Sequence, residues 1–361
     1  MKRSAASLTR YRAPSPVDFM TSSTILYTES ELGTQVVSHG ELVERFGLQA
    51  MGRVLDRAGI RTRRVAPSGI SGSDLGFAAA ERLLAKHHID RASIDLLIFC
   101  TQSPDYWLPT TACILQDRLG LGPCAAFDIN LGCSQYVYAL SVAHSMIVAK
   151  CSNRALVITG DTMSHFVNPL DRSVVPLMGD AGTATLVGPA GAGEGFLGFE
   201  LGTDGSGHQH LMIPAGGARI PLSDETGIET TDAEGNVRSK ENLFMNGVAI
   251  FHFAISTVPG VIRSLLGKLQ LRVEDIDLYL FHQANKYMLD HICKKMGIPG
   301  NKTHFYIEDI GNTSGSSLPV VLGDALQRGK IRPGSKVLII GFGVGLSWGA
   351  TVVQWPGEKS A

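Results

Sequence analysis

The sequence predicts an α/β protein built from two similar halves that pack together. The chain has 361 residues, of which 44% are hydrophobic, which is enough for two domains or one large fused pair. The stretch SIDLLIFCTQS at 93–103 recurs as DIDLYLFHQAN at 275–285. Each copy is a short apolar run between helix-like segments, as expected for a strand covered on both faces. Two long copies favour a pseudo-symmetric pair of α/β layers over a solenoid.

The other elements of the two halves also correspond. The helix-like segments are, in chain order, 75–89 and 111–121 in the first half and 251–269 and 289–298 in the second. Later strands are expected at 154–161, 179–188, 335–343 and 345–355. We therefore place the first half at 22–190 and the second at 191–361. The polar, glycine-rich stretch 203–242 is expected to be a surface excursion near their junction.

Residues 1–21 precede the first half and are expected to form an N-terminal extension. The opening stretch MKRSAASLTRYRAPSPVDF is basic and contains Ser and Pro, but it lacks the apolar centre of a signal peptide. We favour a dispensable extension, or translation that begins at Met20, over a transit peptide.

Charge and cysteine usage argue against several classes of protein. The 32 Lys and Arg nearly cancel the 33 Asp and Glu, so no overall field recruits nucleic acid or an anionic membrane. No uninterrupted run of about 18 apolar residues predicts a membrane span. The six cysteines are dispersed, with neither a CxxC pair nor zinc-finger spacing. We expect a reducing, cytoplasmic location.

The stretch FDINLGCSQYVYAL places Cys133 at a turn between a strand and a helix. The run AAFDI at 125–129 is expected to be a buried strand, and 134–150 an apolar helix. A cysteine at a helix N-terminus faces unpaired N–H groups and the positive end of the helix dipole, which favour the thiolate. Cysteine is also among the most frequently buried residues. This local context leaves open whether Cys133 is a nucleophile or an inert core residue.

Two further polar residues follow expected strands. His282 comes directly after LYLF, and Asn312 comes after HFYIEDIG. Reactive groups of α/β sheets gather at the carboxyl ends of strands, where both residues would lie. Each also has an ordinary alternative, since a histidine can be a hydrogen-bonded core residue and Gly-Asn is a common turn.

The glycine-rich stretch IIGFGVGLSWGA at 339–350 does not fit a dinucleotide-binding motif. Leu346 stands where the third glycine should be, and no helix and second strand follow. Glycines here instead allow backbone N–H groups to approach a ligand closely. Together with a thiol, a proton-handling histidine and an amide donor, this loop suits acyl-thioester chemistry.

The ordered motifs of this chain resemble those of the β-ketoacyl-acyl-carrier-protein synthase III family, which belongs to the thiolase-like condensing enzymes. They are FDINLGCSQ, LFHQAN, IGNTSGSS and GFGVGLSWG, and the resemblance covers essentially 25–355. Chalcone-synthase-like relatives differ around the histidine and asparagine, and chain-elongating ketoacyl synthases carry a second histidine where Asn312 stands. The resemblance implies a five-layered αβαβα fold and a homodimer.

The resemblance also implies a decarboxylative Claisen condensation, in fatty-acid initiation or a specialised metabolite pathway, with the following mechanism. Cys133 takes an acyl group from acyl-CoA or an acyl carrier protein, and a malonyl thioester then binds and loses CO₂. His282 and Asn312 donate hydrogen bonds to the thioester oxygen, and the backbone N–H groups of Cys133 and Val344 form the oxyanion hole. Val344 replaces a common glycine, but a backbone donor survives this change. No metal or redox cofactor is expected, because the departing CO₂ generates the carbanion.

Other positions of the resemblance concern the substrate. Arg57 and Arg172 match basic contacts to the nucleotide of coenzyme A, and Asn285 matches a pantetheine contact. Leu108 falls where a bulky aromatic residue limits the acyl pocket of short-chain members, so the resemblance is compatible with a longer or branched primer and does not fix its length. Gln135 stands where the family usually has glycine after Cys-Ser, and the sequence offers no reason for it.

Two other functions remain compatible with these residues. A related enzyme would pass the acyl group from Cys133 to an alcohol or amine without decarboxylation. A non-catalytic partner subunit would shape a heterodimer, although such subunits usually lose the nucleophile, and this chain retains Cys133, His282 and Asn312.

Overall fold

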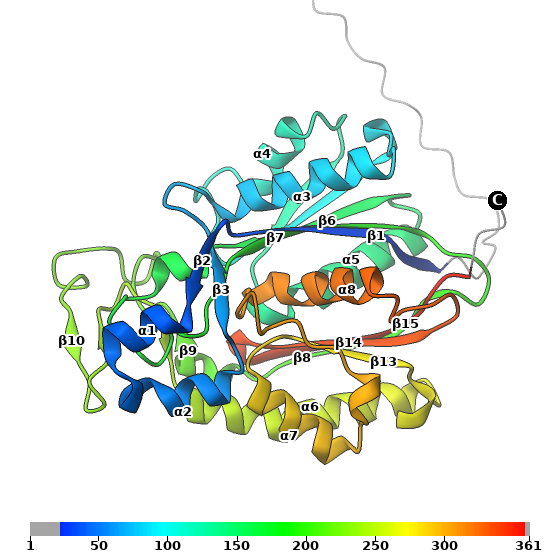
Figure 1. Ribbon diagram of the computed structural model, residues 1–361. Coiled ribbons are helices and arrows are strands. Elements are labelled where there is room, and N and C mark those ends of the chain that lie inside the picture. The colour runs from blue at the N-terminus through cyan, green and yellow to red at the C-terminus, as the bar shows by residue number, and fades with distance from the viewer. Residues whose placement is uncertain (1–21, 358–361) are drawn as a thin grey trace, which may run out of the picture.

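The computed structural model describes residues 22–357, which form two main β-sheets between layers of helices (Figure 1). The expected extension at 1–21 lies outside the described residues. The first sheet has the strand order β1-β7-β6-β4-β5. Its strands are β1 (Ser23–Leu32), β7 (Ala181–Pro189), β6 (Ala155–Asp161), β4 (Leu96–Cys100) and β5 (Ala125–Ile129). The second sheet comprises β13 (Leu278–Phe281), β14 (Lys336–Gly343), β15 (Ser347–Gln354) and β8 (Gly195–Thr203).

The two sheets repeat one topology. In the first sheet β4 and β6 are parallel, and β7 runs antiparallel to both β6 and β1. In the second sheet β13 and β14 are parallel, and β15 runs antiparallel to both β14 and β8. At the position of the second sheet that is equivalent to β5, the structure has an isolated β-bridge between Tyr279 and Thr303 instead of a strand. The duplicated stretches of the sequence therefore occupy equivalent central strands.

Helices cover both outer faces and fill the space between the sheets, which gives the five layers seen in Figure 1. The outer helices of the first sheet are α3 (Gly72–Lys86) and α4 (Thr111–Arg118). Between the sheets lie α5 (Gln135–Val148) and α8 (Ser317–Gln327), and the second sheet is covered by α6 (Gly247–Lys268) and α7 (Lys286–Met296). The αβαβα order expected from the resemblance is confirmed.

Helix α3 shows how local sequence sets the spacing of these layers. It begins with a capping box, in which Ser71 accepts from the N–H of Asp74 and the Asp74 carboxylate accepts from the N–H of Ser71. A Cβ atom on Gly72 would lie 2.5 Å from the carbonyl oxygen of Gly160 in β6. Glycine at this position therefore lets the start of the helix rest directly on the sheet.

The Ile-Asp pair that recurs in the sequence has a structural role in both halves. Asp95, just before β4, accepts from the N–H of Asn153 at 2.8 Å and of Arg154 at 3.1 Å, next to the start of β6. Asp277, just before β13, accepts from the N–H of Lys336 at the start of β14 at 2.8 Å. Each aspartate thus ties the beginning of one central strand to that of its neighbour.

One expectation from the sequence needs correction. β5 was expected to be a buried strand, but it lies at the edge of its sheet, and its residues are exposed or only half-buried.

Helix α6 is long and apolar enough to span a membrane, although its sequence contains no uninterrupted apolar run of that length. Its buried residues, including Ala254 and Val258, pack in the core beside the second sheet, so α6 is a core helix.

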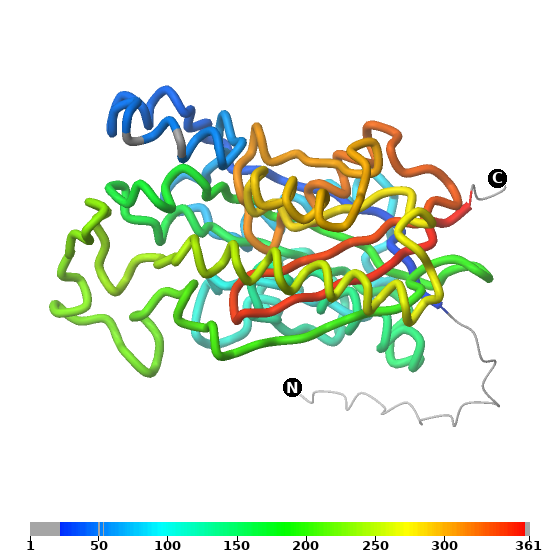
Figure 2. Tube along the Cα trace, turned by 90° about the horizontal axis from the view of Figure 1, so that it is seen from below, coloured from blue at the N-terminus to red at the C-terminus, as the bar shows by residue number. Residues whose placement is uncertain are grey.

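Two excursions leave the sheets at the same end of the molecule, as Figures 1 and 2 both show. The first consists of β2 (Gln35–Ser38), α1 (His39–Phe46), α2 (Leu48–Ala58) and β3 (Thr62–Val65). The second contains two short strand pairs, β9 (Leu211–Met212) with β12 (Phe244–Met245) and β10 (Thr230–Thr231) with β11 (Val237–Arg238).

Candidate active site

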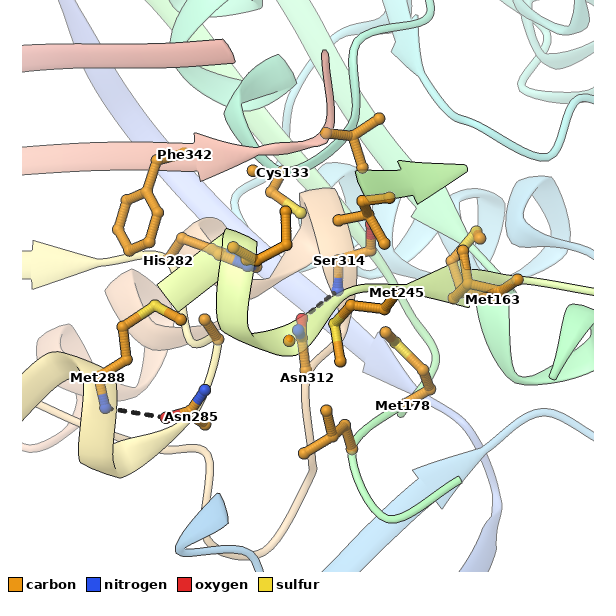
Figure 3. Close-up of a pocket in the computed structure, with 18 of the residues that line it drawn as sticks. Cys133, Met163, Met178, Met245, His282, Asn285, Met288, Asn312, Ser314 and Phe342 are labelled. Atoms are coloured by element: carbon orange, nitrogen blue, oxygen red, sulfur yellow. Dashed lines mark hydrogen bonds between the residues drawn. The ribbon is translucent and has the colours of Figure 1, made fainter. Parts of the chain in front are cut away.

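Three segments from both halves bring polar side chains into one pocket. Cys133 lies in the turn between β5 and α5, His282 directly follows β13, and Asn312 precedes the turn that starts α8. All three line the same pocket, and Figure 3 shows them facing one another. The structure therefore brings together the three candidates chosen from the sequence.

One turn geometry presents both Cys133 and Asn312. Gly132 has φ +80° and Gly311 has φ +78°, so the residue before each functional side chain adopts the left-handed conformation that glycine tolerates best. Both turns continue through a short 3₁₀ segment into a helix. The duplication thus supplies two equivalent strand-to-helix turns, one carrying the thiol and the other the amide.

Hydrogen-bond donors surround the Cys133 sulfur. Sγ faces the backbone N–H of Val344, its own backbone N–H and the hydroxyl of Ser314. A Cβ atom on Gly343 would lie 2.8 Å from Sγ, so a larger residue there would displace the strand end. The two backbone N–H groups are the pair expected to form an oxyanion hole.

Burial controls the charge of the Cys133 thiol. Removal from water raises its pKa to about 11, and the nearby charge of Asp161 adds to that rise. The N–H of Val344 and the hydroxyl of Ser314 lower the pKa, but by less than burial raises it. Burial therefore disfavours the thiolate more than the nearby donors favour it, against the expectation from the helix N-terminus.

His282 is held as a neutral imidazole. Its side chain is buried, and burial lowers its pKa to about 3. Nδ1 lies 2.6 Å from the Ser317 hydroxyl, which also accepts from the backbone N–H of Gln283 at 3.3 Å. We assign the hydroxyl hydrogen to the bond with Nδ1, and a neutral imidazole whose Nδ1 accepts this hydrogen carries its own proton on Nε2. His282 consequently offers an N–H donor to the pocket.

Asn312 is fixed through both its backbone and its side chain. Its N–H donates to the carbonyl of Leu177 at 2.7 Å, and its own carbonyl accepts from the N–H of Gly179 at 3.0 Å. Its Oδ1 accepts from the backbone N–H of Ser314 at 2.9 Å, the bond drawn in Figure 3. Because the side-chain oxygen is occupied, the NH₂ group is left to donate into the pocket.

The rest of the inner pocket is mainly apolar and rich in methionine. Four methionines line it, and Figure 3 shows them around the polar residues: Met163, Met178, Met245 and Met288. Methionine side chains are unbranched and adapt their shape readily. This lining suits an apolar group of variable shape.

An outer pocket continues from the inner one, because Leu177, Met245, Gly247 and Asn285 line both. Arg57 lines the outer pocket, with its guanidinium 5.7 Å from the ring centroid of Tyr287. Asn285 caps α7 through its Oδ1, which accepts from the N–H of Met288 at 2.8 Å. Its NH₂ group is the part left for a ligand in the passage.

Two of the expected substrate contacts do not line either of these two pockets. The guanidinium of Arg172 donates to the carbonyl of Glu234, a residue that lines the outer pocket. Leu108 is 86% exposed and adjoins Trp107, which is 76% exposed. Within the single chain, Leu108 therefore does not bound the inner pocket.

Sequence reasoning missed the residues that orient the three candidates. Ser314 and Ser317 lie inside the motif IGNTSGSS, where hydroxyl residues look like ordinary turn punctuation. Gln102 lines the inner pocket and donates from Nε2 to the Ser314 hydroxyl at 2.7 Å. The sequence could have pointed to Gln102 by its position. Like the other candidates it follows an expected strand, β4, and therefore lies at the same edge of the sheet.

Comparisons with known proteins cover both halves. The chain matches the family described as 3-oxoacyl-[acyl-carrier-protein (ACP)] synthase III over residues 127–205 and its C-terminal counterpart over residues 266–355. It is 35% identical over 329 residues to the beta-ketoacyl-[acyl-carrier-protein] synthase III of Caldanaerobacter subterraneus subsp. tengcongensis, covering 90% of this chain and 97% of that protein.

Solved structures agree with the sequence comparison. A crystal structure of a 3-oxoacyl-(acyl-carrier-protein) synthase III aligns with TM-score 0.89 at 39% identity, covering 92% of this chain and all of the other. The 3-oxoacyl-(acyl-carrier protein) synthase of Burkholderia xenovorans LB400 aligns with TM-score 0.86 at 36% identity, covering 93% and 94%. The chain therefore belongs to the β-ketoacyl-acyl-carrier-protein synthase III family of thiolase-like condensing enzymes, and it is an acyltransferase of that family.

Proposed function

We propose that this enzyme condenses an acyl group, carried on Cys133, with a malonyl thioester to give a 3-ketoacyl thioester and CO₂. The observation that carries this proposal is the convergence of Cys133, His282 and Asn312 on one apolar pocket. A thiol surrounded by N–H donors suits acyl transfer, and two neutral donors opposite it suit an enolate.

In the first half-reaction the Cys133 sulfur attacks the carbonyl of the donor thioester. The backbone N–H groups of Cys133 and Val344 stabilise the tetrahedral oxyanion, and each such donor typically lowers the barrier by about 3–4 kcal/mol. Cys133 starts as a thiol, so its proton leaves with the thiol group that the donor releases. The products are acyl-Cys133 and free coenzyme A or carrier thiol.

In the second half-reaction a malonyl thioester occupies the same pocket. The Nε2–H of His282 and the NH₂ of Asn312 donate to the thioester oxygen, on which negative charge grows as CO₂ departs. The resulting carbanion attacks the acyl carbonyl and forms the new C–C bond, and the Cys133 sulfur leaves as a thiolate that takes up a proton from water. Because His282 is neutral, it acts here as a hydrogen-bond donor, and the departing CO₂ supplies the electron pair.

The continuous pockets support a route for the thioester arm and its acyl chain. Asn285 lies at the passage between the pockets, and Arg57 lines the outer one, where the phosphate groups of coenzyme A or a carrier's phosphopantetheine would enter. Lys294, near the C-terminal end of α7, adds exposed positive charge that suits an acidic acyl carrier protein. The methionine-rich inner pocket favours a longer or branched apolar primer.

A homodimer is also part of this proposal, supported by the open edge of the first sheet. β5 pairs only with β4, and its partly exposed apolar side chains are suited to cover by a second copy. The N–H of Ala125 and the carbonyl of Ile129 both form hydrogen bonds to the chain next to β4, so they lie on the paired side of β5. Since alternate residues of a strand point their backbone groups in opposite directions, Ala126 directs its N–H to the open edge.

Two further points of this proposal concern organisation and location. We divide the described chain near residue 190, because the strands of the first sheet end at Pro189 and β8 of the second begins at Gly195. We place the enzyme in the cytoplasm, since its six cysteines are all free thiols, as suits a reducing compartment.

Intact-protein mass spectrometry after exposure to a panel of acyl-CoAs tests acylation of Cys133. We expect one acyl increment on the natural chain, none on Cys133→Ala, and an unchanged increment on Cys113→Ala, which removes an exposed thiol. Longer or branched acyl groups should load at least as fast as acetyl. An increment that persists in Cys133→Ala would refute the assignment of the nucleophile.

Release of CO₂ from malonyl-carrier protein, with acyl-CoA as primer, tests the condensation itself. His282→Ala and Asn312→Ala should each lower the rate by about 100-fold or more, because each removes a donor to the developing enolate. His208→Ala, which removes an exposed histidine outside the pocket, should leave the rate unchanged. Acyl transfer to an alcohol or amine with no CO₂ and no 3-ketoacyl product would favour the alternative acyltransferase.

The charge of His282 is measurable by NMR of histidine ring carbons and nitrogens, with the signal assigned by its loss in His282→Gln. Since the folded-state pKa is about 3, well below the ordinary value, the ring stays neutral with the Nε2–H tautomer from pH 5 to 8. Ser317→Ala should weaken this tautomer preference while the ring remains neutral. A protonation midpoint near the ordinary histidine pKa of about 6.5 would contradict the neutral-donor role.

Light scattering at micromolar concentration tests the dimer. The natural chain should have the mass of two chains, and Ala126→Pro should reduce it to that of one, because proline removes an N–H from the open edge while leaving the bonds to β4. Val148→Ser, a change at an exposed apolar residue on α5, should leave the mass at two chains. A single-chain mass for the natural protein would rule out the dimer.

A further inference from the structure

The second excursion contains a hairpin that forms part of the outer pocket. β10 and β11 pair antiparallel, and Figure 1 shows β10 at the left edge of the molecule, away from both sheets. The Asp232 carboxylate closes the turn, because it accepts from the N–H groups of Glu234 at 3.1 Å and Asn236 at 2.8 Å. Gly235 has φ +80°, a conformation that glycine tolerates best. This turn of defined shape brings Asp232, Glu234 and Asn236 to the lining of the outer pocket.

One arginine holds the hairpin in place. Nε of Arg238 lies 2.8 Å from Oδ2 of Asp171, and Nη2 lies 2.9 Å from Oδ2 of Asp232. The Arg238 side chain is 16% exposed, and its guanidinium lies 5.5 Å from the ring centroid of Phe244. Arg238 lines the outer pocket, but two carboxylates already share its donors. Its charge therefore fastens the hairpin to the chain and is not free for a ligand.

A second arginine also contacts the hairpin. Arg172 donates to the carbonyl of Glu234, and a Cβ atom on Gly235 would lie 2.6 Å from Nη2 of Arg172. Glycine at this position thus lets the turn approach the guanidinium closely. The sequence predicted Arg172 as a contact to the nucleotide of coenzyme A, yet Arg172 does not line the outer pocket. The hairpin turn engages the group that was expected to bind the nucleotide.

The hairpin also sets the balance of charge in the outer pocket. Of the Lys, Arg, Asp and Glu side chains described in its lining, Arg57 and Glu234 form no ion pair with another described residue. Glu234 is exposed, and the Arg57 guanidinium lies 5.7 Å from the ring centroid of Tyr287. One unpaired cation suits one phosphate group, and a neighbouring carboxylate disfavours further phosphates.

The two thioester donors differ in this respect. The phosphopantetheine arm of a carrier protein has a single phosphodiester, whereas coenzyme A has a diphosphate and a separate 3′-phosphate. An outer pocket with one unpaired cation therefore matches the first donor better than the second.

We propose that the β10–β11 hairpin makes the outer pocket selective for phosphopantetheine, so that the preferred acyl donor is an acyl carrier protein rather than acyl-CoA. The inference rests on the proposed function, in which a thioester arm passes through the outer pocket to Cys133. Arg57 binds the phosphate of the arm. The hairpin engages Arg172 and adds the Glu234 carboxylate, so nucleotide phosphates gain no cation and meet like charge. Acyl-CoA still loads Cys133, but with lower affinity.

Calorimetric binding of three ligands to Cys133→Ala tests this selectivity without turnover. Pantetheine, 4′-phosphopantetheine and coenzyme A share the thiol arm and differ in their phosphates and nucleotide. Because of Arg57, 4′-phosphopantetheine should bind about 10-fold more tightly than pantetheine. Coenzyme A should bind no more tightly than 4′-phosphopantetheine. An affinity for coenzyme A that is about 10-fold or more above that for 4′-phosphopantetheine would overturn the proposal.

Variants in the same Cys133→Ala background assign the selectivity to residues. Arg57→Ala should remove most of the advantage of 4′-phosphopantetheine over pantetheine. Glu234→Gln should tighten coenzyme A about 3-fold and leave pantetheine unchanged, because it removes an exposed like charge. Glu225→Gln, a matched change at an exposed carboxylate outside the outer pocket, should alter none of the three affinities. Arg172→Ala should not weaken coenzyme A selectively.

Two variant results count against the proposal. Selective loss of coenzyme A binding in Arg172→Ala would show that this guanidinium contacts the nucleotide. An unchanged coenzyme A affinity in Glu234→Gln would show that the hairpin carboxylate does not select.

On the natural chain, the same acyl group should load Cys133 with a lower KM from acyl carrier protein than from coenzyme A, and the reverse order would overturn the assignment of the donor. Loading from neither donor would contradict the proposed function, while the binding series would still test the pocket.

Discussion

The site depends on one constraint, the burial of its reactive side chains away from water where the two halves meet. Burial raises the pKa of Cys133 and lowers that of His282, so a thiol and a neutral imidazole face each other. Such a site has little charge of its own with which to attract substrate, and its chemistry depends on the orientation of neutral donors. Ser317 holds the ring of His282, and the backbone N–H of Ser314 holds the amide of Asn312.

The duplicated architecture explains why these groups meet and why they differ. Cys133 and Asn312 occupy equivalent turns, each preceded by a glycine with positive φ. Asp161 and Phe342 stand at corresponding places near the ends of β6 and β14, so one half contributes a carboxylate and the other an aromatic ring against His282. Equivalent backbone positions have thus acquired complementary chemistry, with the thiol and a buried carboxylate in one half and the neutral donors in the other.

Much of this arrangement was predictable because it depends on local patterns. Apolar runs of strand length, the repeated Ile-Asp pairs and the glycine turns are encoded within a few residues, and they predicted the paired halves and the three candidates. Position at the edge of a sheet is not encoded locally, which is why the sequence predicts a buried strand at β5: most of its residues are apolar, but one of its edges is unpaired. The positions of Leu108 and Arg172 outside the two pockets likewise depend on loops whose path the sequence pattern does not specify.

The sequence by itself determined which chemical groups are available and at which strand ends they stand, since side-chain identity and strand periodicity are properties of the chain. Only the tertiary structure decided their charge and orientation. Burial raises the pKa of the Cys133 thiol, against the expectation from its helix N-terminus, because desolvation outweighs the nearby donors. Gln135 finds a hydrogen-bond partner in Asp161 only because β6 and the glycine of a distant loop place that carboxylate within its reach. Electrostatic effects of this kind depend on distances between segments far apart in the chain.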